Sequence, residues 1–148
     1  MLNGFKDENS QGLLYGMMSP LYLRFAFVYI RPGKGSKNQI YKMLNDYKCG
    51  DCDVIMGDLN LNPKIAREKA RILQLCNENL EIALQEETTT NTFHQIDHIL
   101  THKRLRGRTF VTSYFTFLSD HKLIVGRFGI GDHYLKKRSN PESYILFI

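Results

Sequence analysis

The distribution of apolar and polar residues divides the chain into strands and helices joined by turns. Residues 21–30 combine apolar and aromatic side chains densely enough to predict a buried strand, which Pro32 and the glycines after it end in a turn. Ser36 can cap a helix, because apolar residues recur at helical spacing after it. The apolar run over residues 54–56 predicts a second buried strand. A strand, a helix and a strand in this order are typical of the βαβ unit of an α/β fold.

Further elements are predicted in the second half of the chain. Asn62 and Pro63 are suited to begin a helix that ends near residues 77–79, and the threonine-rich residues 86–91 favour an irregular loop. A polar turn is expected at Lys103 to Arg108. The remaining periodic segments predict three strands, over residues 95–101, 109–117 and 121–128.

Length and composition favour one globular domain with a hydrophobic core, since 43% of the 148 residues are hydrophobic. Residues 12–128 carry the periodic patterns and form this domain. Residues 1–11 are expected to be disordered or truncated, and residues 129–148 to form a C-terminal tail. Three cysteines argue against a disulfide framework, and the spacing of Cys49 and Cys52 supplies only half of a zinc site.

The balance of charges favours an anionic partner such as nucleic acid, because 20 Lys and Arg outnumber 15 Asp and Glu and give a net charge of +5. No run of about 18 apolar residues is present, and the N-terminal segment is polar. We therefore expect no membrane span and no secretion signal. An intracellular location follows as an expectation, with the nucleus as a candidate compartment.

Polar side chains capable of metal or phosphate chemistry stand at the ends or edges of the apolar strands. Asp58 and Asn60 follow the second strand, where α/β sheets bind their ligands, although a glycine and an aspartate here also suit an ordinary turn. Asp97 lies within a later strand, and Asp120 with His121 precedes another. Because buried carboxylates are costly unless they are paired or bind a cation, these positions suggest a shared site.

Four short blocks of the sequence resemble, in order, motifs of the endonuclease/exonuclease/phosphatase superfamily, which includes apurinic endonucleases, the endonucleases of non-LTR retrotransposons, DNase I and inositol phosphatases. The blocks are Phe27-Val28-Tyr29-Ile30-Arg31-Pro32, Met56-Gly57-Asp58-Leu59-Asn60, Gln95-Ile96-Asp97-His98-Ile99-Leu100 and Ser119-Asp120-His121-Lys122-Leu123-Ile124. They look most like retroelement or helicase-associated endonuclease domains. The resemblance covers residues 12–128 and implies a DNase I-like four-layer α/β sandwich of two sheets with helices outside.

The resemblance implies roles in phosphodiester hydrolysis for five residues. His121 would contact the scissile phosphate, and Asp97 would orient its ring. Asp58 would position or deprotonate the attacking water, while Asn60 would donate a hydrogen bond to the phosphate. Tyr29 would contact the phosphate or the leaving oxygen through its hydroxyl, although an aromatic residue at a strand end is also common in a core.

A metal ion and a nucleic-acid substrate, with DNA favoured, are implied as well. Asp120 would bind Mg²⁺ or Mn²⁺, whose Lewis acidity suits this reaction. Arg31, Lys103, Arg104 and Arg106 would contact substrate phosphates, although a charged turn is more often simply solvated. The expected function is a metal-dependent, endonuclease-like hydrolase. Two alternatives stay open: a non-catalytic domain that binds nucleic acid or a partner, and a phosphatase acting on small or lipid phosphoesters.

Part of the family pattern is absent from the sequence. The resemblance implies an early strand with an asparagine and a following strand with a metal-binding glutamate, but the segment before Tyr29 shows no such pattern. We therefore expect the chain to be an incomplete, C-terminal half of the fold. That this half is inactive stays open as an alternative. Loss of one sheet would expose the apolar inner face of the other, which predicts self-association or pairing with a partner fragment.

Overall fold

The computed structural model describes residues 2–6, 12–18, 23–32, 52–76, 79–129 and 143–147, with side chains described over 23–32, 52–76 and 79–129. Its elements form a six-stranded sheet, in the order β1-β2-β3-β4-β6-β5, and a three-stranded sheet, in the order β7-β8-β9. The elements are β1 (Leu2–Lys6), β2 (Gly12–Met18), β3 (Leu23–Tyr29), β4 (Val54–Asp58), α2 (Ala66–Cys76), β5 (Leu80–Ile82), β6 (Asp97–His102), the 3₁₀ helix η2 (Lys103–Leu105), β7 (Thr109–Tyr114), β8 (Leu123–Gly129) and β9 (Ser143–Phe147).

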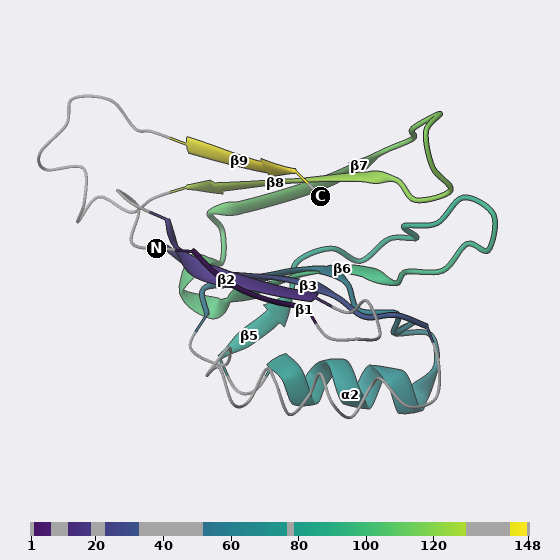
Figure 1. Cartoon of the computed structure of the whole chain (residues 1–148), viewed down its shortest axis with the longest axis horizontal. Helices are drawn as coiled ribbons and strands as arrows, with labels where there is room; N and C mark the ends of the chain where they lie inside the picture. Colours follow the sequence, from purple (N-terminus) through teal and green to yellow (C-terminus); the bar gives the residue numbers. More distant parts are fainter. Residues whose placement is uncertain are drawn as a thin grey trace, which may run out of the picture.

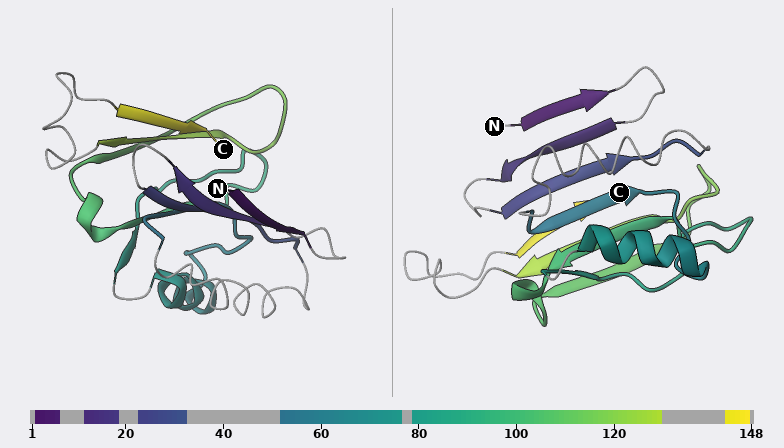
Figure 2. Two further views of the ribbon diagram at one scale, coloured as in Figure 1. Left: turned by 60° about the vertical axis from the view of Figure 1, so that its left-hand side comes forward. Right: turned by 90° about the horizontal axis from the view of Figure 1, so that it is seen from below.

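The described elements lie in three layers (Figure 1). The sheet of β7, β8 and β9 covers one face of the six-stranded sheet, and α2 covers the other. The two turned views in Figure 2 show the same arrangement. A mixed α/β architecture is thereby confirmed, whereas the expected four-layer sandwich is not.

The strands on both sides of the predicted βαβ unit are neighbours, as expected. β3 and β4 pair in parallel, and β6 pairs antiparallel with β4 on its other side. The helix predicted after Ser36 lies outside the described residues. The strands predicted over residues 95–101, 109–117 and 121–128 are found as β6, β7 and β8.

The two ends of the chain are more ordered than their sequences indicate. Leu2–Lys6, within the segment expected to be disordered or truncated, form β1 and pair antiparallel with β2. In the expected tail, Ser143–Phe147 form β9 and pair antiparallel with β8. Both strands lie at sheet edges and form by pairing with a neighbouring strand, and the pattern within one segment does not show that contribution.

The predicted second helix is found as α2, and polar side chains hold the turn before it. Asn62 Oδ1 accepts a hydrogen bond from the Lys64 N–H at 3.0 Å. Glu68, in the first turn of the helix, accepts one from the Asn62 N–H at 2.8 Å. In the described part of the chain, no helix is both long enough and apolar enough to span a membrane.

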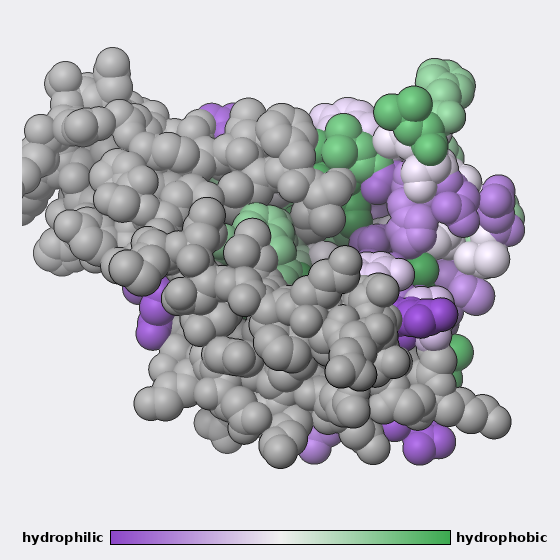
Figure 3. Space-filling model, viewed as in Figure 1, coloured by the Kyte–Doolittle hydropathy of each residue, from purple (hydrophilic) through white to green (hydrophobic). Residues whose placement is uncertain are grey.

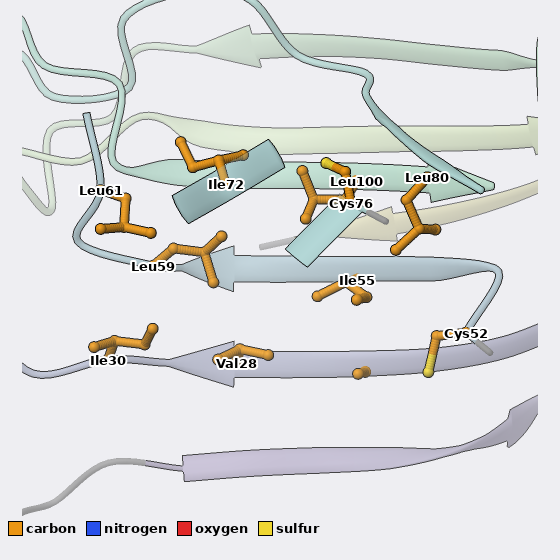
Figure 4. Close-up of a cluster of buried hydrophobic side chains, with 11 residues drawn as sticks. Val28, Ile30, Cys52, Ile55, Leu59, Leu61, Ile72, Cys76, Leu80 and Leu100 are labelled. Atoms are coloured by element: carbon orange, nitrogen blue, oxygen red, sulfur yellow. The ribbon is translucent and has the colours of Figure 1, made fainter. Parts of the chain in front are cut away.

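One hydrophobic core lies between the six-stranded sheet and α2 (Figure 4). Val28, Ile55 and Leu100 of three neighbouring strands pack there with Ile72 and Cys76 of the helix. The alternation of side chains along each strand sends every second residue to this face. The amphipathic helix therefore covers the outer face of the sheet.

A second core fills the space between the two sheets. Phe25, Met56 and Ile99 of the large sheet pack against Ile124 and Phe128 of β8. The expectation of a bare inner face is therefore wrong for the described strands, because the chain supplies a second sheet that covers it. Nothing in the described residues supports the self-association that was inferred from a bare face.

An ion pair between a buried aspartate and a half-exposed arginine joins the start of β4 to η2, and its loss should destabilise the fold. The fully buried Asp53 carboxylate accepts hydrogen bonds from the Arg24 backbone N–H at 2.8 Å and from the Arg104 guanidinium at 2.5 Å. Asp53→Ala removes the acceptor from both donors, and we expect it to lower the free energy of unfolding by about 2–4 kcal/mol. Urea denaturation measures the loss.

The exposed ion pair between Glu81 and Arg106 provides the matched control. Solvent screens this pair, so Glu81→Ala should cost much less than Asp53→Ala. Equal losses in the two variants would contradict a special contribution from the buried carboxylate.

Candidate active site

Three polar side chains form a row across the large sheet, at one end of the core between the sheets. The register pairs Tyr29 of β3 with Asp58 of β4, and Asp58 with Asp97 of β6. Paired residues of neighbouring strands project from the same face. Two residues back along β3 and β4, the next row on this face is apolar and belongs to the core between the sheets. The polar row therefore borders that core at the carboxyl ends of β3 and β4.

Hydrogen bonds from Asn60 fix the backbone around Asp58. Asn60 has a φ of 47°, and its backbone N–H donates to Asp58 Oδ1 at 2.8 Å. Its side-chain Nδ2 donates to the carbonyl of Ile30 at 2.5 Å, which joins the exit of β4 to the exit of β3. This side-chain bond to the backbone differs from the predicted one, which was directed at a substrate phosphate.

The environment of Asp58 favours its neutral form. Asp58 is half-buried, and desolvation is the main cause that raises its pKa to about 6. The Asn60 N–H opposes this rise by stabilising the carboxylate, the nearby Asp97 adds to it, and His121 opposes it. A carboxyl group that titrates this close to neutrality is suited to accept a proton from water.

His121 reaches the row from the connection between β7 and β8. An isolated antiparallel bridge between Thr89 and His121 holds this connection against the loop that follows β5. The Thr90 N–H also donates to the Asp120 carbonyl at 2.7 Å. These contacts place His121 Nδ1 at 2.9 Å from Asp97 Oδ2. Since Nδ1 is engaged, Nε2 is the ring nitrogen available to a ligand.

The site brings two carboxylates and one imidazole together from three separate segments. Ligand atoms of Asp58, Asp97 and His121 all lie within 4.8 Å of one another. We call these three residues the Asp-Asp-His cluster. A cavity of about 250 Å³ adjoins the cluster and is lined by Asp97, Thr116, Ser119, His121, Lys122, Leu123 and Ile124. Carboxylate and imidazole ligands in this combination suit a divalent cation.

Thr88 is a supporting residue that the sequence analysis missed. Its fully buried hydroxyl accepts hydrogen bonds from the N–H groups of Ile96 and Asp97, each at 3.1 Å. Its carbonyl accepts one from the Lys122 N–H at 2.7 Å. Thr88 thus holds the backbone of Asp97 and of Ile96 before it, and the backbone of Lys122, which follows His121. The available signal was a run of threonines shortly before the Ile-Asp-His-Ile block, because their hydroxyls often bind backbone groups.

The structure does not bring all of the predicted residues into the cluster. Tyr29 lies at the end of the polar row and is 45% exposed, and Arg31 is exposed just beyond β3. Asp120, the predicted metal ligand, is exposed and is not a member of the Asp-Asp-His cluster. It contributes its backbone carbonyl to the loop contact instead. His98 projects to the opposite face of β6, where Nε2 lies 2.7 Å from the Leu61 carbonyl.

The predicted phosphate-binding cations lie at the opposite end of β6 from Asp97. Lys103 and Arg104 are in η2, which begins where β6 ends, and Arg106 follows it. The six residues of β6 span roughly 17–20 Å. Arg104 is paired with a buried aspartate and Arg106 with a glutamate. The prediction that these cations flank the site is therefore wrong, because the strand carries them away from it.

The raised pKa of Asp58 predicts a dependence of stability on pH. The pKa of about 6 in the folded protein exceeds the ordinary 3.8, so the folded state binds this proton more readily than the unfolded chain. The corresponding stability is present below pH 3.8 and is lost as the pH rises to about 6. We expect a loss of roughly 1–2 kcal/mol after allowance for the partial exposure of the group.

Asp58→Asn isolates this contribution, since the amide does not titrate. In EDTA, the variant should be more stable than the wild type above pH 6, and the difference should shrink toward pH 4. Urea denaturation of both proteins across this range measures the difference, with Glu86→Gln in an exposed loop as the control. A stability difference that does not change with pH would contradict the raised pKa.

Comparisons with known proteins found a similar fold among solved structures but no match at the level of the sequence. No protein-family model matches the chain, and no curated protein sequence matches it. Among solved structures, the chain is similar to the endonuclease domain of TRAS1, a telomere-specific non-LTR retrotransposon, with a TM-score of 0.57 and 14% sequence identity. The match covers 82% of this chain and 64% of that one, so this chain spans less than two thirds of the structure it matches. This similarity shows an endonuclease-like fold.

Proposed function

We propose that the chain is a metal-dependent phosphodiester hydrolase domain that cleaves nucleic acid, with DNA as the favoured substrate. The observation that carries the proposal is the Asp-Asp-His cluster. Residues from β4, from β6 and from the connection between β7 and β8 form this cluster beside a cavity. The fold similarity to the TRAS1 endonuclease domain supports it at the level of the fold alone. A net charge of +5 suits a polyanionic substrate.

The proposed reaction is the attack of a water molecule on the phosphorus of a phosphodiester. The P–O bond to the leaving sugar oxygen breaks, and this oxygen takes a proton from solvent. Asp58 accepts a hydrogen bond from this water, positions it for the attack and takes up its proton. Asp97 accepts a hydrogen bond from Nδ1 of His121 and stabilises the protonated ring, so that the Nε2–H donates a hydrogen bond to a phosphate oxygen and stabilises the developing charge. The Tyr29 hydroxyl donates a hydrogen bond to the same phosphate. The backbone N–H of Asn60 donates one to the Asp58 carboxylate and holds it in place.

A divalent cation fits the residues that are present. Asp58 and Asp97 lie side by side, and the charge of Asp97 adds to the rise that burial causes in the pKa of Asp58. A bound cation would relieve this repulsion, and the two carboxylates would hold Mg²⁺ or Mn²⁺. Such an ion supplies Lewis acidity that stabilises negative charge on the phosphate.

Nicking of a supercoiled plasmid tests the proposal. The wild-type chain should nick the plasmid with Mg²⁺ or Mn²⁺ and not with EDTA, whereas Asp58→Ala and His121→Ala should be inactive. His102→Ala, at the opposite end of β6 from the cluster, is the matched control and should retain activity. Background-level nicking by all of these proteins would contradict the proposed hydrolase.

The other two functional classes give different results in the same experiment. Salt-sensitive DNA binding without nicking would indicate a non-catalytic binding domain. Release of phosphate from a small phosphoester, without nicking of DNA, would indicate a phosphatase.

A further inference from the structure

The connection between β7 and β8 carries a group of exposed apolar side chains. Phe115 is 77% exposed, and Phe117 and Leu118 are essentially fully exposed. Figure 3 shows hydrophobic, green atoms at this end of the molecule, next to hydrophilic, purple ones. Three large apolar side chains standing together in water are unusual for an isolated protein and mark a binding surface. We call the segment Phe115–Leu118 the aromatic tip.

The aromatic tip belongs to the segment that walls the cavity beside the Asp-Asp-His cluster. Thr116 and Ser119 line this cavity together with His121. Phe117 precedes His121 by only four residues, so their Cα atoms are at most about 14 Å apart. A molecule bound at His121 therefore has the aromatic tip as a neighbour.

The chemistry of the aromatic tip favours a flat, uncharged partner beside an anionic group. No charged residue occurs from Tyr114 to Leu118, so the tip has no cation that would pair with a phosphate. Lys122, which also lines the cavity, places Nζ 5.0 Å from the centroid of the Phe115 ring. A nucleotide offers this combination, because its base can stack on a ring while its phosphate lies near a cation.

We infer that the aromatic tip is a stacking platform for an unpaired nucleobase of the strand whose phosphate lies at His121. The inference rests on the proposed function, since a phosphate at His121 defines where the strand runs. A base within a duplex has both faces covered by its neighbours, so such a platform selects nucleotides that are single-stranded or displaced from the helix.

A tryptophan introduced at the tip reports stacking directly. The chain contains no tryptophan, so Phe117→Trp places a single tryptophan there, whose fluorescence can be excited apart from that of the eight tyrosines. In EDTA, titration with single-stranded oligothymidylate should quench its fluorescence. An oligomer with the same phosphates and abasic sugars should not. Phe110→Trp, at the exposed start of β7, is the control and should respond to neither. Equal quenching by both oligomers, or none by either, would overturn the inference.

The affinity of alanine variants for oligothymidylate provides an independent measurement that does not require an introduced tryptophan. The double variant Phe115→Ala/Phe117→Ala should bind oligothymidylate on the order of 10-fold or more weakly, as fluorescence anisotropy of a labelled oligomer measures. Phe110→Ala should bind it as the wild type does. Unchanged affinity in the double variant would overturn the inference. The inference would also be overturned if sedimentation showed a dimer for the wild type and a monomer for the double variant, because the tip would then be a contact between two copies of the chain.

The plasmid assay separates the failure of this inference from the failure of the proposed function. Quenching and weakened binding without nicking would retain the stacking platform and reject the hydrolase. Nicking without quenching would retain the hydrolase and reject the platform.

Discussion

Gly57→Ala is expected to prevent folding, or to lower the free energy of unfolding by more than about 4 kcal/mol. Gly57 has a φ of +134°, a conformation that L residues with a side chain rarely adopt. A Cβ atom at this position would lie 2.0 Å from the carbonyl oxygen of Val28 in β3. Because that oxygen belongs to the backbone of the neighbouring strand, the contact is relieved only if β3 and β4 separate.

Gly107→Ala is the matched control for this substitution. Gly107 also has a positive φ, of +74°, but no atom lies within 4 Å of the position its Cβ would take. Only the conformational cost of about 1 kcal/mol is expected there. Circular dichroism and urea denaturation of both variants measure the difference. Similar losses would show that strain in φ, and not the contact with β3, explains the requirement for glycine.

The role of Gly57 shows how the sequence motif and the structure differ in detail. The glycine before Asp58 is expected to provide a tight exit from the strand, but it lies within β4 and pairs with Val28 and His98 on its two sides. The turn beyond the strand depends on Asn60, whose φ is positive. A glycine inside a strand marks a close approach of two backbones, and here that approach sits one residue before the polar row.

The members of the Asp-Asp-His cluster could be identified from the sequence, because each occupies a position that local patterns define. Asp58 ends a buried strand, Asp97 begins one, and His121 shortly precedes another. The register of β4 and β6 then brings the two aspartates opposite each other. Strand periodicity predicts where a polar residue stands on its strand, and the resemblance implied that these residues act in one site.

The residues that sequence reasoning misplaced are those whose position depends on distant contacts. Arg104 lies in a charged turn and was expected beside the site, but it pairs with Asp53, 51 residues away along the chain. Thr88 has no local feature that distinguishes it from the other threonines, and its function depends on how its loop folds against β6. Such long-range pairings follow from the packing of the sheets and leave no periodic signal in the sequence.

Asp97→Asn is expected to reduce the rate of nicking by roughly 10²- to 10⁴-fold while the chain stays folded. A carboxylate only accepts hydrogen bonds, so Asp97 accepts one from Nδ1 of His121, 2.9 Å away, and stabilises the protonated ring whose Nε2–H donates to the phosphate. An asparagine amide has no charge and can donate to Nδ1, which favours the neutral ring with its proton on Nε2 and removes the positive charge from beside the phosphate. The variant keeps the size of the side chain and removes one of two neighbouring carboxylates, so no large loss of stability is expected.

Nitrogen chemical shifts of His121 test the orienting role apart from the rate. The wild type should show a proton on Nδ1 at a pH where the ring is neutral, and Asp97→Asn should show it on Nε2. Glu86→Gln, in an exposed loop, makes the same change from carboxylate to amide and should alter neither the tautomer nor the rate. A slower variant with an unchanged tautomer would mean that Asp97 acts on the reaction through its charge or a bound cation. An unchanged rate with a switched tautomer would mean that the reaction does not depend on the way Asp97 holds the His121 ring.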